Sequence, residues 1–135
     1  MPVIAVDPIM MGSAKLTIGA NDYEGHVSSA MFTPANNTPV IWKGLTASSV
    51  FSFGTKATWT LDLEYAQDWE TADSLAKYLL ANEGNEVVAV FEPVDGGQGY
   101  TATVIITPGA IGGAVDSVAT ATVSLGVKGK PTPAV

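Results

Sequence analysis

The 135-residue sequence contains no cysteine and no arginine, and its only histidine is His26. Without cysteine, the chain can form no disulfide, no thiolate metal site and no cysteine nucleophile. Secretion under disulfide protection is therefore excluded, whereas a reducing compartment is permitted. A catalytic triad or a histidine metal site would need partners that one histidine does not have. We therefore expect no catalytic residue, no metal and no cofactor, and we expect His26 to lie at the surface or at a sheet edge.

All six basic residues are lysines, and 13 acidic residues give the chain a net charge of −7. Arginine makes most bidentate contacts to bases and phosphates, and a negatively charged protein repels a polyanion. These facts argue against a sequence-specific nucleic-acid reader. No apolar run approaches the roughly 18 residues of a membrane span. The N-terminus lacks the basic start of a signal peptide, so no membrane partner is expected.

The chain length fits one domain, which should bury about two-thirds of the surface of the unfolded chain. We expect an extended arm over 1–13, a β-rich domain over 14–130 and a C-terminal tail over 131–135. The apolar residues of the arm should dock on its own domain or on a neighbouring copy. They are Val3, Ile4, Val6, Ile9, Met10 and Met11.

Alternating apolar and polar residues predict strands, because successive strand side chains point to opposite faces. The pattern is clearest over 57–65 and over 117–127, and each segment has one apolar and one polar face. The polar residues are Thr58, Thr60, Asp62 and Glu64 in the first segment and Thr120, Thr122 and Ser124 in the second. Asp62 and Glu64 project side by side, as an acid–base pair would in a cleft, but a solvated polar face is the favoured interpretation. Further strands are predicted over 15–19, 23–32, 40–44, 86–93 and 100–108. In the segment 23–32, Tyr23, Val27 and Met31 are predicted to lie on one face.

One helix is predicted over about 71–83, with Thr71 or Asp68 as its N-cap and Gly84 as its left-handed stop. A helix of about twelve residues is marginal alone, so it should pack on a sheet. The predicted fold class is therefore mainly antiparallel β, a sandwich or open barrel, with one flanking helix.

Residues 45–56 have no clean period and are predicted to form a long loop. Loops of this length in compact domains are usually functional or disordered. The apolar residues in this one, Val50, Phe51 and Phe53, indicate a contact surface rather than a solvated tether. If copies of the chain associate through these apolar segments, deleting either this loop or residues 1–12 should block polymerisation and leave a folded monomer.

The run TWTLDLEYAQDWETADSLAKYLLANEGNEVVAVFEP, a glycine-containing hairpin and then VATATVSLGVKGKPT resemble the major tail tube proteins of long-tailed phages with non-contractile tails. Among these, the sequence is most similar to proteins of phages that infect actinobacteria. The likeness spans roughly Thr58 to Thr132. Its most specific pieces are the block QDW…LAKYLLANEG before a strand and the terminal V-x-GKPT.

The resemblance implies a structural virion protein and not an enzyme. Six copies would close into a ring whose sheets join into a continuous inner β-barrel. Rings would stack through the arm, the long loop and the C-terminal tail, with Lys128 and Lys130 among the subunit contacts. Because the chain stops at GKPTPAV, the immunoglobulin-like domain that some family members append is not expected.

The same resemblance implies a tail tube that is assembled in the host cytoplasm and conducts genomic DNA without reading its sequence. The implied partners are further copies of the chain, a tape measure protein, tail chaperones, a terminator and baseplate or tip proteins.

A lysine-rich channel would grip DNA, which carries one negative charge per about 1.7 Å. One of the two polar faces, Thr58/Thr60/Asp62/Glu64 or Thr120/Thr122/Ser124, is therefore expected to line the channel, the alternative being ordinary wet sheet surface. Two other functions stay open. The first is a β-sandwich binding module that uses its aromatic residues for carbohydrate or protein, and the second is a single-ring tail terminator or head–tail completion protein.

Overall fold

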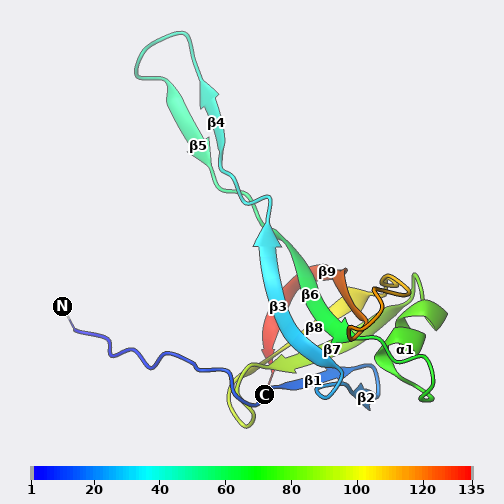
Figure 1. The fold of residues 1–135 in the computed structure, drawn as a ribbon. Coiled ribbons are helices and arrows are strands. Elements are labelled where there is room, and N and C mark those ends of the chain that lie inside the picture. Colours follow the sequence, from blue (N-terminus) through cyan, green and yellow to red (C-terminus); the bar gives the residue numbers. More distant parts are fainter. Residues whose placement is uncertain (1, 135) are drawn as a thin grey trace.

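A computed structural model describes residues 2–134 and contains one seven-stranded antiparallel sheet, a two-stranded hairpin and one helix (Figure 1). This confirms the predicted mainly β class with a single flanking helix. The strands of the large sheet are β1 (Lys15–Ile18), β2 (Asn21–Asp22), β3 (Val27–Ala35), β6 (Thr58–Ala66), β7 (Glu86–Glu92), β8 (Gly99–Ile105) and β9 (Thr120–Ala134). The hairpin consists of β4 (Val40–Lys43) and β5 (Val50–Phe53), and the helix is α1 (Leu75–Ala81).

The large sheet has the strand order β2-β1-β7-β8-β9-β6-β3 and encloses the core on one face. The apolar rows predicted for the two clearest strands point to this face, because alternate residues are buried along each of them. In β6 they are Leu61, Leu63 and Tyr65, and in β9 they are Ala121, Val123 and Leu125. The two strands are neighbours, with Leu63 opposite Val123. Their polar residues therefore share the opposite face.

Helix α1 is shorter than the predicted 71–83 and packs its buried residues Leu75, Ala76 and Leu79 against the core. Its N-cap is Ser74, whose hydroxyl accepts a hydrogen bond from the backbone N–H of Lys77. The predicted caps Thr71 and Asp68 were therefore wrong.

The helix cannot begin earlier because Asp73 has a φ of 60°, outside the helical region. Its carbonyl accepts a hydrogen bond from the buried Tyr23 hydroxyl at 3.1 Å. The Asp68 carboxylate instead caps a preceding turn, accepting from the backbone N–H groups of Glu70 and Thr71. Gly84 does take the predicted left-handed conformation, with a φ of 84°.

Strand β3 begins later and runs further than the predicted 23–32. An irregularity in its register between Val27 and Ser29 shifts the alternation. Met31 consequently lies on the outer face and is 54% exposed, although the sequence pattern aligned it with Tyr23 and Val27.

The predicted loop 45–56 contains a strand, β5, which pairs with β4 from Val40↔Phe53 to Lys43↔Val50. The last strand, β9, is also longer than predicted. It takes in the expected tail 131–135 as far as Ala134, and Tyr100 of β8 pairs with Pro133. Met1 of the arm and Val135 of the tail lie outside the described residues.

Candidate assembly surfaces

The β4–β5 hairpin projects from the body on an extended stem (Figure 1). Its apolar side chains are exposed. Every residue of both strands is exposed. The large apolar residues concerned are Val40, Ile41, Trp42, Val50, Phe51 and Phe53, each between 50% and 59% exposed. A two-stranded hairpin is at best marginally stable by itself in water. This element therefore stands to gain from packing against another surface.

The register divides the hairpin into two unlike faces. Val40 lies opposite Phe53, and Trp42 lies opposite Phe51, so these four side chains share one face. We call Val40, Trp42, Phe51 and Phe53 the aromatic face. The rings of Trp42 and Phe51 are 5.9 Å apart, which is contact distance for an aromatic pair. The other face is mixed, since it carries Lys43 and Ser52 among its four residues.

Side-chain hydrogen bonds join the two segments of the stem, one before β4 and one after β5. The Thr55 hydroxyl donates to the carbonyl oxygen of Thr38 at 2.8 Å. Nearer the body, the Asn36 amide donates to the Thr58 hydroxyl at 3.2 Å. The stem contributes no buried core residue. The hairpin is thus held in one piece without being part of the core.

Only the C-terminal end of the N-terminal arm, just before β1, lies beside the body, and the rest of the arm extends away from it (Figure 1). Its base is fixed by the backbone N–H of Asp95, which donates to the Ser13 carbonyl at 2.9 Å. The apolar residues predicted to dock are all exposed in the single chain. Their exposed fractions are Val3 97%, Ile4 88%, Val6 83%, Ile9 67%, Met10 91% and Met11 53%.

The two polar faces predicted from the sequence form a single surface, because β6 and β9 are adjacent. Thr60 pairs with Gly126, Asp62 with Ser124, and Glu64 with Thr122. We call this surface the polar face. It consists of Thr58, Thr60, Asp62, Glu64, Thr120, Thr122 and Ser124, all of which are exposed or half-buried. No lysine is among these residues, which makes the surface neutral to acidic.

Asp62 is held in place at the centre of the polar face by neighbouring hydroxyls. The Thr33 hydroxyl donates to one carboxylate oxygen at 2.8 Å, and the Thr60 hydroxyl donates to the other at 3.1 Å. Partial burial raises the pKa of Asp62, but hydrogen bonds from Ser124, Thr33 and Thr60 together outweigh it. The pKa of this carboxyl therefore lies below its usual value, and the polar face keeps its negative charge near neutral pH.

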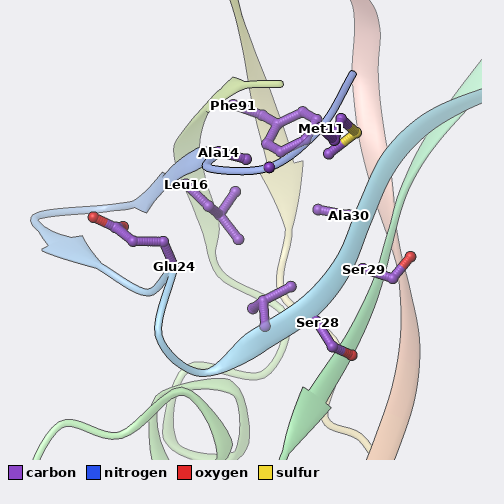
Figure 2. Close-up of a pocket in the computed structure, with 10 residues that line it drawn as sticks. Met11, Ala14, Leu16, Glu24, Ser28, Ser29, Ala30 and Phe91 are labelled. Atoms are coloured by element: carbon purple, nitrogen blue, oxygen red, sulfur yellow. The ribbon is translucent and has the colours of Figure 1, made fainter. Parts of the chain in front are cut away.

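The sheet curves so that β3, the strand at one end, and β1, the second strand from the other end, line the same cleft of about 210 Å³. Figure 2 shows Leu16 of β1 and Ala30 of β3 on opposite sides of this cleft, with Met11 of the arm beside it. No β1–β3 pairing closes it, and among the described strands β3 pairs only with β6. The outer edge of β3 consequently presents backbone groups that another strand could pair with.

A further exposed apolar segment, the loop over 107–119, was not singled out by the sequence pattern. Val115 is 90% exposed, Val118 is 77% exposed and Ile111 is 67% exposed. The side-chain amide of Gln67 anchors the loop, donating to the Gly112 carbonyl and accepting from the Gly112 backbone N–H, both at 2.9 Å. Ile111 and Val115 are spaced irregularly, so no strand or helix period indicated them. Val118 falls in the segment 117–127 that was predicted to be a strand, but β9 begins only at Thr120.

The two lysines expected among the subunit contacts, Lys128 and Lys130, differ in their surroundings. The Lys128 ammonium forms an ion pair with the Glu86 carboxylate at 3.3 Å, and both side chains are at least half exposed. Lys130 is exposed and lies beside Trp59 and Pro131 in a second cleft, of about 450 Å³. An exposed pair of this kind contributes at most about 1 kcal/mol, so Lys128 remains open to other partners.

The residues weighed for chemistry are scattered. His26 is half-buried, and its ring packs edge-on against Tyr23 at 5.6 Å. Trp69 is half-buried and donates from its indole N–H to Gln67, while Trp42 is exposed on the hairpin. Residues 2–134 contain no group of three or more His, Asp or Glu side chains placed to hold a metal ion.

The one helix within the described part of the chain has seven residues, which is too few to cross a bilayer. A scan against protein-family models and a search of curated proteins each found no match to this chain.

Proposed function

We propose that the protein is a structural virion protein that assembles into stacked rings, which form the tube of a non-contractile phage tail and conduct DNA during infection. The observation that carries the proposal is the hairpin, an aromatic element that projects outside the core and whose large apolar side chains are at least half exposed. Fully burying one large apolar side chain stabilises an interface by about 1.5–3 kcal/mol. The four side chains of the aromatic face therefore offer a strong driving force for association.

The arm supports the same conclusion from a second part of the chain. A contiguous exposed apolar segment is typical of a protein–protein contact rather than of a free monomer surface. Arm and hairpin reach away from the body in different directions, so one copy can contact more than one neighbour (Figure 1). Contacts of this heterologous kind build rings or extended filaments.

The unpaired edge of β3 gives a route to ring closure. An exposed strand edge favours pairing with another chain, and a closed ring removes such edges. Next to this edge lies the polar face, since β3 pairs with β6. Joining the sheets of several copies edge to edge would bring their polar faces into one continuous surface.

The composition of the polar face suits the lining of a DNA channel. Hydroxyls and carboxylates carry no positive charge for phosphates to bind, whereas lysines would retard the polyanion. Asp62 is ionised at the pH of a cell, and the hydrogen bonds that lower its pKa favour this charged form further. We therefore assign the channel lining to β6 and β9 together.

Negative-stain electron microscopy of the concentrated, purified protein tests the proposal. Tubes or stacked rings are the expected result. Isolated rings that never stack would favour the single-ring terminator instead. Particles that stay monomeric under all conditions would refute self-assembly and favour the binding module.

A further inference from the structure

The β4–β5 hairpin and the 107–119 loop lie at opposite ends of strand β6. The hairpin stem leads directly into Thr58, where β6 begins. The loop is held where β6 ends, because the backbone N–H of Gln67 donates to the Ala119 carbonyl at 2.9 Å and Ala66 pairs with Thr120. A strand of nine residues is about 30 Å long. Two exposed apolar elements are thus separated along one axis of the molecule.

Several contacts hold the 107–119 loop in a defined conformation. The side-chain NH2 of Gln67 donates to the Gly112 carbonyl, and its side-chain oxygen accepts from the Gly112 N–H. The Ser117 hydroxyl donates to the Ala114 carbonyl at 3.0 Å. Gly109 lets the loop cross the Tyr65 hydroxyl closely, since a Cβ at position 109 would collide with it. These contacts leave Val115 at the tip of a turn with its side chain in solvent.

The two elements carry charges of opposite sign. Asp116 is the only charged residue in 107–119, and it sits beside Val115 in the turn with a φ of 64°. The hairpin with its stem, residues 36–57, contains Lys43 and Lys56 and no acidic residue. Lys43 lies on the face opposite the aromatic face, so the attraction acts between the two elements at long range and not through a direct contact of Lys43. Complementary charge of this kind steers association and disfavours pairing of like elements.

We infer that the 107–119 loop is the acceptor for the aromatic face of the hairpin of a second copy, stacked along the β6 axis. The inference rests on the proposed function and adds the surface that receives the hairpin. Copies that repeat head to tail bring the hairpin end of one against the loop end of the next. Such a contact propagates into a tube, whereas pairing of two hairpins with each other would stop at two copies.

A complementation experiment tests the pairing. The donor variant W42D/F51D places two carboxylates on the aromatic face of the hairpin. The acceptor variant V115D/V118D places two carboxylates on the 107–119 loop. All four positions are exposed, so both variants should keep the fold, which circular dichroism and thermal unfolding will verify. V88D, at an exposed position on the outer face of β7, is the matched control and should polymerise as the unmodified chain does.

Each blocked variant alone should lose stacking in sedimentation velocity. Their mixture should form a species of twice the unstacked mass and stop there, because only one functional donor–acceptor pair remains. The inference is overturned if the acceptor variant polymerises normally. It is equally overturned if the mixture stays unstacked while the unmodified chain stacks.

Cysteine cross-linking gives an independent readout, because the chain has no cysteine of its own. Chains carrying F51C, mixed with chains carrying V115C and then oxidised, should give a disulfide-linked dimer on a non-reducing gel. The control mixture, F51C with V88C, should give little. Equal yields from the two mixtures would contradict the assignment of the acceptor. If the unmodified chain never associates, the proposed function itself fails, whereas tubes that form without this cross-link reject only the acceptor.

Discussion

The hairpin can be removed in a way that leaves the sheet intact. Ala35 and Thr58 are direct partners in the last β3–β6 pair before the stem. A two-residue Asn-Gly connection forms a type I′ turn, which matches the twist of the flanking strands. Replacing residues 36–57 by Asn-Gly should therefore join β3 to β6 as a tight hairpin.

The structure sets the expected effect of this replacement on the free energy of unfolding. The segment contributes no buried side chain, and its main internal contact is the pair of Trp42 and Phe51, which is worth about 0.5–1.5 kcal/mol. Shortening the connection about tenfold lowers the entropy cost of closing it by roughly 2 kcal/mol. The free energy of unfolding of the body should therefore rise by about 1 kcal/mol. This change corresponds to a Tm increase of roughly 4 °C.

Urea unfolding followed by the fluorescence of the remaining Trp59 and Trp69 measures the stability of the body, and electron microscopy measures assembly. The expected outcome is a body as stable as before, or more so, that no longer forms tubes. A loss of more than about 2 kcal/mol would place the hairpin in the folding unit, contrary to its exposure. Tubes of normal appearance would remove the hairpin from the assembly contacts.

Three further variants test other parts of the account. Deleting residues 2–12 should leave the Tm within about 2 °C and prevent polymerisation, as checked by thermal unfolding and sedimentation; normal tubes would refute the role of the arm. Asp62 has a lowered pKa, so the stability it contributes is present above about pH 4 and is lost as the pH falls through the folded value. D62N should accordingly narrow the stability difference between pH 6 and pH 3 in urea titrations, and an unchanged difference would contradict this. G109A should lower the free energy of unfolding by about 1–3 kcal/mol because its Cβ meets the Tyr65 hydroxyl, whereas the matched G113A, with ordinary contacts only, should lower it by less than about 1 kcal/mol.

The strongly alternating strands were predictable because one of their faces is buried. In β6 and β9 a shift of one residue would expose a full apolar row, so the sequence pattern alone determines which side faces the core. Where a single local feature interrupts the pattern, the prediction failed. The positive φ of Asp73 shortened the helix, and the irregularity after Val27 turned Met31 outward.

The assembly surfaces were only partly predictable. The sequence indicated two separate polar faces, because the pairing of β6 with β9 joins residues far apart in the chain. It indicated a contact function for 45–56 from Phe51 and Phe53, but not the strand pairing that groups them with Trp42. Residues 107–116 gave no periodic signal, and the exposed side chains of the 107–119 loop became evident only from the fold.

The central claim, self-assembly around a channel lined by the polar face, is tested most directly by cryo-electron microscopy of the concentrated full-length protein. The account predicts stacked rings in which β6 and β9 of every copy turn Asp62 and Ser124 toward the lumen. Single particles of 13.9 kDa at every concentration would contradict it, as would a tube whose channel is lined by a different face.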